Sequence, residues 1–341
     1  PVLLTLEPLI GALAAGNCCV LKPSAYSPAT SAVMKKMIAD VFPEEYVTVI
    51  EGGREENQNL LSQKFDYIFF TGGVQVGKMV MEKAAANLTP VTLELGGKSP
   101  CIIDKSANLK LTAKRLAFGK YLNCGQTCVA PDYVLVHEAV KEEFLKLLKS
   151  EIRAMYGEDP LKNPDYGKMI NRKHFDRVLG LMKEEKLILG GENDTASLRI
   201  APAVMDQVTE DDAVMQEEIF GPLLPVLTIG SMEEAIAFVN RRPKPLALYL
   251  FTENRETEKN VLEYTSFGGG CINDTIIHLA TSQMGFGGVG NSGMGSYHGK
   301  KSFETFSHEK SIVKKYTWMD LPMRYQPYTG WKEKLVRMFV K

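Results

Sequence analysis

Short apolar runs alternate with longer amphipathic stretches over the first hundred residues. The runs that predict strands are residues 18–21, 47–50, 66–70 and 91–95. A helical pattern begins after Ser27, with Pro28 in the first turn, where its missing N–H is tolerated, and another spans residues 74–86. Strands that alternate with helices in this way predict a parallel sheet with crossover helices.

After Gly96-Gly97 the helices become longer and the strands more scattered. One apolar face repeats at helical spacing through Val140, Phe144, Leu147, Leu148, Ile152 and Met155, and a second through Phe175, Val178, Leu179 and Met182. A further helix is expected at residues 232–240, and strands at 133–137, 223–229 and 246–251. The pattern predicts a second α/β unit, with a domain boundary near Gly96.

Composition narrows the class of protein. The chain has 341 residues, which corresponds to about two domains. Its 40 basic and 41 acidic residues balance to a net charge of −1, so no nucleic-acid partner is indicated. With 45% hydrophobic and 24% charged residues it resembles a soluble globular protein, neither disordered nor membrane-spanning. Because Pro1 opens directly on an apolar run, we expect the chain to start inside a domain.

Six cysteines in a chain of this length, without a secretory signal, are typical of cytosolic thiols. None has the C-x-x-C spacing of a zinc or thioredoxin-type site, and the histidines show no metal-binding cluster. We therefore expect no metal and a cytoplasmic location.

Ten of the 29 glycines fall between Gly268 and Gly299. One interpretation is a flexible surface loop. The interleaved His278, Phe286 and Tyr297 favour an ordered segment that approaches a ligand or another strand, since solvated linkers carry few aromatic residues.

The turn TGGVQVGK follows an expected strand and opens a helix, an arrangement that can hold a phosphate with free N–H groups and the helix dipole. Its glycines, Gly72, Gly73 and Gly77, do not have the G-x-G-x-x-G spacing, and such turns are structural about as often as they bind. Lys22 ends the first expected strand, at the edge where open α/β sheets bind ligands; a solvated lysine is the alternative.

Four further side chains could carry chemistry. Cys128, in NCGQTCVAPDY, is a candidate nucleophile, although a lone cysteine is more often a small buried residue. Glu94 ends an apolar strand and is either paired for structure or held at a raised pKa as a general base. Glu217 and Glu218 precede an apolar run, with surface charge as the alternative interpretation.

Together these segments resemble the aldehyde dehydrogenase superfamily. Six motifs occur in family order over essentially the whole chain: GALAAGNCCVLKPS, FTGGVQVG, LELGGKSP, GQTC, EEIFGP and FGGVGNSGMG. The segments CVAPDYV and YHGKKSFETFSH resemble the class 3 branch, which oxidises fatty and aromatic aldehydes with NAD or NADP. The resemblance implies an α/β fold with an incomplete variant Rossmann cofactor domain (residues 1–93), a catalytic domain (94–302) and a bridging, dimer-forming segment (303–341).

The resemblance also implies roles for individual residues. Cys128 would be the nucleophile and Glu94 the base that activates the deacylating water. In the cofactor site, Lys22 would bind the adenosine ribose, the turn with Gly72, Gly73 and Gly77 would lie under the pyrophosphate, Glu218 would hold the nicotinamide ribose, and Phe220 would pack by the nicotinamide. Asn273 and Phe286 would border the substrate.

Two departures from the family pattern concern the cofactor. Ala25 stands where the family usually has the glutamate of KPSE, so we expect NADP to be tolerated better than a glutamate would allow. Gly73 replaces a frequent serine, which removes one hydroxyl donor to the phosphates.

Pro1 resembles the last proline of the PWN(F/Y)P segment, so the asparagine of the oxyanion hole is expected to precede this chain.

The C-terminal tail has a helical apolar stripe flanked by basic residues. It could cap the substrate entrance, touch a membrane surface, or pack on the protein or a dimer mate; it is too short to span a bilayer. A cofactor-independent thiol hydrolase using Cys128 and Glu94, and a non-catalytic scaffold of the same fold, remain as alternative functions. We expect a small-molecule aldehyde substrate and a homodimer.

Overall fold

The computed structural model describes residues 1–340, which divide into a compact unit of residues 1–307 and a second unit from residue 308 onward. The first elements of the compact unit are α1 (Val2–Ala14), β1 (Cys19–Leu21), α2 (Pro28–Val41), β2 (Val47–Val49), α3 (Arg54–Leu61), β3 (Ile68–Gly72), α4 (Val74–Ala85) and β4 (Val91–Leu95). The predicted strands and helices of this part are confirmed to within two residues. Helix α1 was not predicted, because Pro8 and Gly11 interrupt its apolar pattern.

The parallel pairing predicted for these strands is present, but it is divided between two sheets. Strand β1 pairs in parallel with β2, while β3 pairs in parallel with β4. Each pair has its own apolar cluster: Leu9 of α1 and Ile38 of α2 pack on β2, and Val80 of α4 packs on β4.

The remainder of the unit is built around a seven-stranded sheet of order β13-β12-β5-β6-β11-β10-β7. Its strands are β5 (Pro100–Ile103), β6 (Tyr133–His137), β7 (Leu187–Leu189), β10 (Ala203–Met205), β11 (Leu223–Ile229), β12 (Ala247–Phe251) and β13 (Gly269–Ile272); β8 (Asn193–Asp194) and β9 (Arg199–Ile200) form a separate hairpin. The helices are α5 (Leu109–Tyr121), α6 (Lys141–Tyr156), α7 (Arg172–Gly180), α8 (Met232–Asn240), α9 (Arg255–Tyr264) and α10 (Lys300–Thr305).

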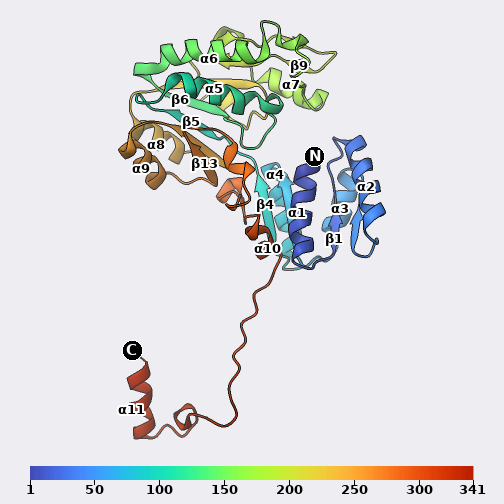
Figure 1. Ribbon diagram of the computed structural model, residues 1–341, viewed down its shortest axis with the longest axis vertical. Helices are drawn as coiled ribbons and strands as arrows, with labels where there is room; N and C mark the ends of the chain where they lie inside the picture. The colour runs from blue at the N-terminus through green and yellow to red at the C-terminus, as the bar shows by residue number, and fades with distance from the viewer. Residues whose placement is uncertain (341) are drawn as a thin grey trace. The chain divides into compact units, whose positions relative to one another are not determined.

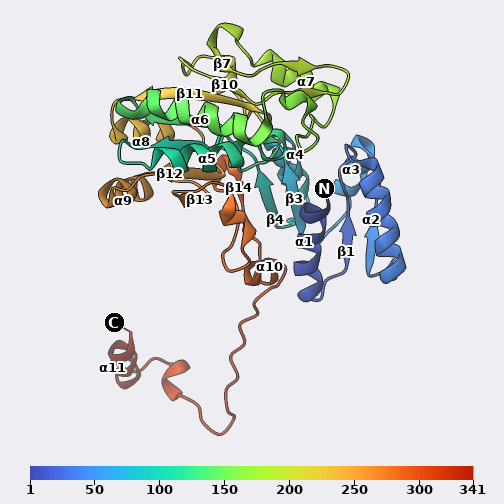
Figure 2. The same cartoon turned by 45° about the horizontal axis from the view of Figure 1, so that its top comes forward.

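Helices cover both faces of this sheet (Figures 1 and 2). Successive residues of β5 point to opposite faces, so Cys101 packs in the same cluster as α5 and α6, while Ile102 packs in the cluster of α7, α8 and α9. Both residues are fully buried. The α/β class predicted from the strand–helix alternation is confirmed.

The glycine-rich segment joins the two parts of the unit. Strand β13 extends the seven-stranded sheet, whereas β14 (Gly293–Met294) returns to pair antiparallel with β4, placing Gly293 opposite Glu94. The expectation of an ordered segment is therefore confirmed over a flexible loop. The domain boundary near Gly96 stays a prediction.

The second unit contains one α-helix, α11 (Gly330–Phe339), within residues 308–340. Across residues 1–340, none of the helices combines the length and apolar character needed to cross a membrane.

Candidate active site

Cys128 lies in a turn at the end of an unusual backbone path. Helix α5 ends at Tyr121, and the chain then passes through three consecutive left-handed residues, Asn123, Cys124 and Gly125, at φ values of 52°, 56° and 72°. For a non-glycine residue this conformation costs roughly 1–2 kcal/mol. Strain of this kind is found where a site dictates the backbone, and here it redirects the chain from α5 toward Cys128.

The Cys128 thiol is held in its protonated form in the structure as it stands. Burial raises its pKa to about 12, and the negative charges of Glu218 and Glu94 act in the same direction. The backbone N–H groups of Cys128 and Val129 oppose these effects by hydrogen bonding to the sulfur. The thiol is therefore near enough to Glu94 and Glu218, two of the carboxylates singled out in the sequence, for their charges to act on it, and it lies beside N–H donors that can also stabilise an oxyanion.

Glu94 is a buried carboxyl group without a hydrogen-bond partner. Only 4% of the residue is exposed, and neither carboxyl oxygen has a partner among the described residues. Burial raises its pKa to about 8. The glycine-rich segment closes over it, since a Cβ atom on Gly287 would lie 3.2 Å from Glu94 Oε1. Of the two interpretations of Glu94, a structural ion pair is excluded and a poised base is supported.

Glu218 also acts on Cys128, but it comes from a different part of the chain, between β10 and β11. A Cβ atom on Gly96 would lie 2.0 Å from Glu218 Oε2, so the carboxylate rests directly on the glycine that follows β4. Burial, and next the charge of Asp132, raise the pKa of Glu218 to about 8. The sequence alone did not single out Asp132.

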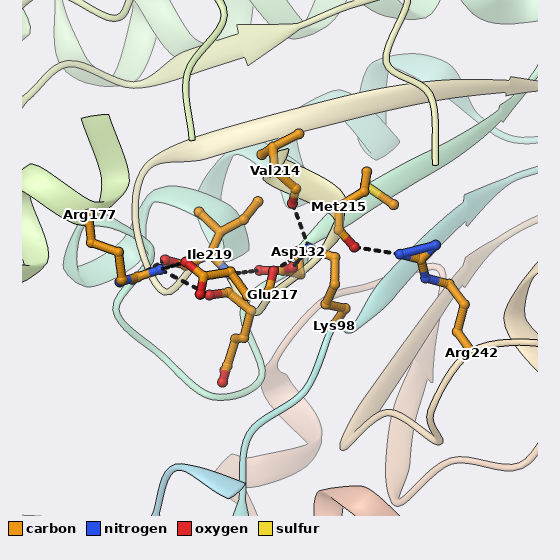
Figure 3. Close-up of polar contacts among 9 residues, drawn as sticks. Lys98, Asp132, Arg177, Val214, Met215, Glu217, Ile219 and Arg242 are labelled. Carbon is orange, nitrogen blue, oxygen red and sulfur yellow. Dashed lines mark hydrogen bonds and ion pairs between the residues drawn. The ribbon is translucent and has the colours of Figure 1, made fainter. Parts of the chain in front are cut away.

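A network of polar contacts holds the segment that carries Glu218 (Figure 3). Lys98 Nζ donates to Asp132 Oδ2, to the Val214 carbonyl at 2.8 Å and to the Glu217 carbonyl at 2.8 Å. Asp132 Oδ1 accepts the N–H of Ile219 at 3.0 Å. Because Asp132 is four residues after Cys128, this network ties the thiol segment to the glutamate segment.

Arg177 and Arg242 complete the support. Arg177 of α7 donates to the Glu217 carboxylate at 2.8 Å and to the Ile219 carbonyl at 2.6 Å (Figure 3). Arg242 donates to the Met215 carbonyl at 2.5 Å. Charged side chains thus fix the backbone from Val214 to Ile219, a contribution that local sequence patterns did not predict.

Phe220 follows this segment in a left-handed conformation, at φ 43°, with its side chain partly exposed. An aromatic residue rarely adopts this conformation, and an exposed ring in such a position is typical of a ligand contact. The arrangement fits the expectation that Phe220 packs against a cofactor ring.

The turn between β3 and α4 has the features of a phosphate cradle. Gly73 is the N-cap of α4, no side chain caps the helix, and a Cβ atom on Gly73 would meet nothing within 4 Å. The first N–H groups of the helix are therefore free for an anion. Gly72 ends β3, with the Phe70 ring 2.5 Å from where a Cβ atom would lie.

Gly77 has a different function from its neighbours. It is buried in α4, and a Cβ atom there would lie 2.5 Å from Leu95 Cδ2 on β4. Its position allows the helix to approach the strand closely, so it shapes the turn through packing.

Lys22 follows the end of β1 and donates from Nζ to the Pro23 carbonyl at 2.7 Å. Partial burial lowers its pKa, while the nearby Glu56 carboxylate opposes this effect. Glu56 itself accepts the N–H of Gly53 at 2.6 Å. A carboxylate from α3 thus lies near Lys22, whereas the exposed Ala25 contributes none.

The two residues expected on the substrate side differ in their environments. The Asn273 side chain forms two hydrogen bonds with the Thr252 backbone, at 2.9 and 2.8 Å, and so links β13 to the end of β12. Phe286 is 8% exposed and packs with His278, Tyr297 and His298. Burial lowers the pKa of His278 to about 4, so this aromatic cluster contains a neutral imidazole at physiological pH.

Comparison with known proteins decides the family. The aldehyde dehydrogenase family model matches residues 1–312. The chain belongs to the aldehyde dehydrogenase family. It is 50% identical over its full length to 4,4'-diaponeurosporen-aldehyde dehydrogenase of Staphylococcus aureus, covering 74% of that protein. It is 49% identical to aldehyde dehydrogenase family 3 member A2 of Pongo abelii, over 92% of this chain and 65% of that protein.

Other relatives of this aldehyde dehydrogenase chain carry information on the cofactor. The dimeric NADP-preferring aldehyde dehydrogenase of dog is 47% identical over 96% of this chain and 73% of its own length. A Mycobacterium tuberculosis aldehyde dehydrogenase complexed with NAD⁺ is 31% identical, with a TM-score of 0.83 over 96% of this chain and 68% of that chain. The family therefore supports NAD or NADP as cofactor.

The solved structures agree with the fold of this aldehyde dehydrogenase chain. The substrate-bound state of Staphylococcus aureus AldH has a TM-score of 0.97 and 50% identity, and the alignment covers 99% of this chain and 74% of that one. The predicted superfamily and its class 3 branch are confirmed by these comparisons. Within residues 1–340, no group of three or more His, Cys, Asp or Glu side chains is arranged to hold a metal ion.

Proposed function

We propose that this chain carries out NAD(P)-dependent oxidation of aldehydes to carboxylic acids through a covalent intermediate on Cys128. The observation that carries the proposal is that the charges of two carboxylates, the buried Glu94 and the half-buried Glu218, act on the Cys128 thiol, and that the pKa of each carboxyl group is raised. Membership of the aldehyde dehydrogenase family supports the same reaction. A cofactor-independent thiol hydrolase would leave the open turn at Gly73 without a function.

The cofactor-binding roles belong to several segments. Lys22 would bind the adenosine ribose, the N–H groups after Gly73 the pyrophosphate, and Glu218 and Phe220 the nicotinamide riboside. The free N-terminus of α4 and the exposed ring of Phe220 support this assignment. When bound, oxidised NAD(P) supplies a hydride acceptor and a positively charged ring.

The first half of the reaction takes place at Cys128. The thiol loses its proton, and the thiolate sulfur forms a bond to the aldehyde carbon while the carbonyl electrons move to the oxygen. Because the resting thiol has a pKa of about 12, it needs a positive charge nearby to ionise at neutral pH. The N–H groups of Cys128 and Val129 are placed to stabilise the developing charge. Loss of hydride from that carbon leaves a thioester.

The second half uses Glu94. Its carboxylate removes a proton from water, the water oxygen bonds to the thioester carbon, and the carbon–sulfur bond breaks to release the acid and restore the thiol. The absence of a hydrogen-bond partner on either carboxyl oxygen leaves both free to accept from water. A pKa of about 8 matches this task at mildly alkaline pH.

We propose medium- to long-chain aliphatic or aromatic aldehydes as substrates. The apolar cluster around Phe286, which contains the neutral imidazole of His278, supports an uncharged substrate. The relative named 4,4'-diaponeurosporen-aldehyde dehydrogenase supports an aldehyde substrate.

We propose further that the protein is a cytoplasmic homodimer. Six free cysteines support a reducing compartment, and a dimeric relative supports the assembly.

We also propose that α11 makes peripheral contact with anionic membranes, since Trp331, Met338 and Phe339 are exposed beside basic residues. Flotation with phosphatidylserine vesicles, compared with neutral vesicles, tests that contact; equal recovery of wild-type protein and a chain ending at residue 329 would contradict it.

A panel of aldehydes assayed with both NAD and NADP tests the proposed reaction. Absorbance at the reduced-nicotinamide band should rise with apolar aldehydes and remain flat with the corresponding acids. Ester hydrolysis at equal rates with and without cofactor, and no reduced cofactor with any aldehyde, would instead favour the thiol hydrolase.

A further inference from the structure

Lys120 is a lysine that the proposed mechanism does not use, and it is completely buried. It lies in the last turn of α5, eight residues before Cys128, with 0% of its surface exposed. Its Nζ has no hydrogen-bond partner among the described residues. Burying an ammonium group in this way is strongly unfavourable unless another charge compensates it.

Among the charged groups that act on Lys120, the Glu218 carboxylate is the one available to compensate the positive charge of its ammonium group. Those that act on it are Asp132, Lys98 and Glu218. Lys98 already donates to three acceptors, and each carboxylate oxygen of Asp132 already accepts a hydrogen bond. The Glu218 carboxylate accepts a hydrogen bond from the Gly97 backbone N–H and none from a described side chain, so it can accept a further donor.

Backbone packing brings the two segments together. A Cβ atom on Gly125 would lie 2.3 Å from the Gly221 carbonyl oxygen and 3.1 Å from the Lys120 carbonyl oxygen. The end of α5 therefore lies directly against the segment that begins at Glu218. Figure 3 shows the polar contacts that hold this segment in place.

We infer that Lys120 is the positioning residue of Glu218: its buried ammonium supplies the counter-charge that keeps the Glu218 carboxylate ionised and available to accept hydrogen bonds from the cofactor ribose. The role in cofactor binding rests on the proposed function, whereas the charge pairing is inferred from the complete burial of Lys120 and from the Glu218 charge that acts on it; no hydrogen bond joins Lys120 Nζ to any described residue. Lys120 acts through Glu218 and does not itself touch the reacting atoms.

The charged groups around Lys120 and Glu218 agree with this role. Burial lowers the pKa of Lys120 to about 8 and raises that of Glu218 to about 8, so each alone favours its neutral form. The groups that also act on Glu218 are Asp132, which opposes its ionisation, and Lys98 and Arg177, which favour it. Lys98 is already paired with Asp132, and Arg177 with Glu217. Lys120 is the remaining unpaired positive charge in this group.

A double-mutant cycle on cofactor binding tests the inference. At pH 7, Lys120→Met should weaken NAD binding about tenfold, or about 1.4 kcal/mol, and the affinity should recover toward pH 9 as Glu218 ionises. In the Glu218→Gln background, Lys120→Met should change the dissociation constant less than about twofold. Lys146→Met, at an exposed position on α6, is the matched control. Losses that add in the double variant, or a pH-independent loss, would overturn the inference.

A second measurement needs neither cofactor nor activity. In Glu218→Gln the buried ammonium has lost its counter-charge, so its folded-state pKa should fall below 8, far under its unfolded value. The folded state then binds fewer protons, and stability should rise with pH between 7 and 8.

The background for this measurement is Lys120→Met/Glu218→Gln, in which both charges of the inferred pair are removed together, so neither is left without its counter-charge. Relative to it, the Tm of Glu218→Gln should rise by about 2 °C between pH 7 and pH 8. Parallel curves for the two variants would overturn the charge pairing. Failure of NAD to bind any variant, with this rise present, would contradict the proposed function and leave the pairing standing.

Discussion

Glu218 lies directly against Gly96: a Cβ atom on Gly96 would lie only 2.0 Å from Glu218 Oε2. Any larger side chain at position 96 must displace the carboxylate. Because that carboxylate is the end of a flexible side chain, Gly96→Ala should change folding stability little, by about 1 kcal/mol or less. We expect it to weaken NAD(P) binding on the order of tenfold, measured by quenching of protein fluorescence.

Gly97→Ala is the matched control for this prediction. A Cβ atom on Gly97 would have its nearest neighbours at 3.6 Å, an ordinary contact. Equal cofactor affinity in the two alanine variants would show that the contact between position 96 and Glu218 does not matter for binding.

Cys128→Ala should abolish formation of reduced cofactor, because it removes the thiol proposed to form the thioester. Stopped-flow and steady-state absorbance with an apolar aldehyde measure the effect. Cys18→Ala removes an exposed thiol and should retain full activity. Appreciable turnover by the Cys128 variant would refute the covalent mechanism.

Glu94→Gln should retain a single burst of reduced cofactor and lose steady turnover, since only deacylation needs the base. In the wild-type protein the steady rate should rise with pH through about 8, as Glu94 loses its proton, and level off above it. A normal steady rate in the variant, or a wild-type rate that falls over this range, would count against Glu94 as the base.

Glu94 also makes the stability of the folded state depend on pH. Its folded pKa of about 8 lies above the ordinary value of 4.5, so the folded state binds more protons between these two values. Stability therefore decreases as pH rises from about 5 to 8. Relative to Glu94→Gln, the wild-type Tm should fall across this range in a calorimetric scan. A constant difference would mean that Glu94 is not buried as described.

Gly73→Ser should be tolerated, because a Cβ atom there meets nothing within 4 Å. Serine at this N-cap adds a hydroxyl beside the free N–H groups, so we expect a gain of a few tenths of a kcal/mol in stability and tighter NAD(P) binding. Gly77→Ser is the contrasting variant, since its Cβ would lie 2.5 Å from Leu95 and should destabilise the fold by about 1–3 kcal/mol. Thermal melts with and without cofactor separate the two effects.

Ala25→Glu should reduce the use of NADP relative to NAD, because an added carboxylate near Lys22 repels a 2′-phosphate. Glu56 already places one negative charge near Lys22, so Glu56→Gln should shift the ratio of kcat/KM values in the opposite direction. Ser24→Glu, at another exposed position, is the control. An unchanged ratio in both Ala25→Glu and Glu56→Gln would mean that this end of the site does not select the cofactor.

Much of the secondary structure was predictable from local pattern. The strands at residues 133–137 and 223–229 and the helix at 232–240 agree with the prediction at both ends. The two strands are continuous apolar runs that are buried on both faces, and the helix has an apolar face at helical spacing; both signals depend on a few neighbouring residues. Helix α1 was not predicted because Pro8 and Gly11 interrupt its apolar pattern, although tertiary packing stabilises the helix.

The candidate chemistry followed from the sequence as a set of separate motifs. Cys128 and Glu94 could be named because their residue types and flanking glycines are distinctive. Lys98 and Asp132 lay within quoted motifs, yet no local signal indicated that they hold the backbone of residues 214–219. Nothing in the pattern around Lys120 distinguished a buried ammonium from a solvated one.

The sequence by itself determined the α/β class, the family motifs and the types of reacting group, because these depend on local periodicity and on residue chemistry. Only the tertiary structure decided which groups meet. It paired Gly293 with Glu94, placed Glu218 against Gly96, and buried Lys120 without a hydrogen-bond partner for its Nζ within residues 1–340. These contacts join segments roughly a hundred or more residues apart, and they set the pKa values on which the chemistry depends, because burial and neighbouring charges are properties of the assembled fold.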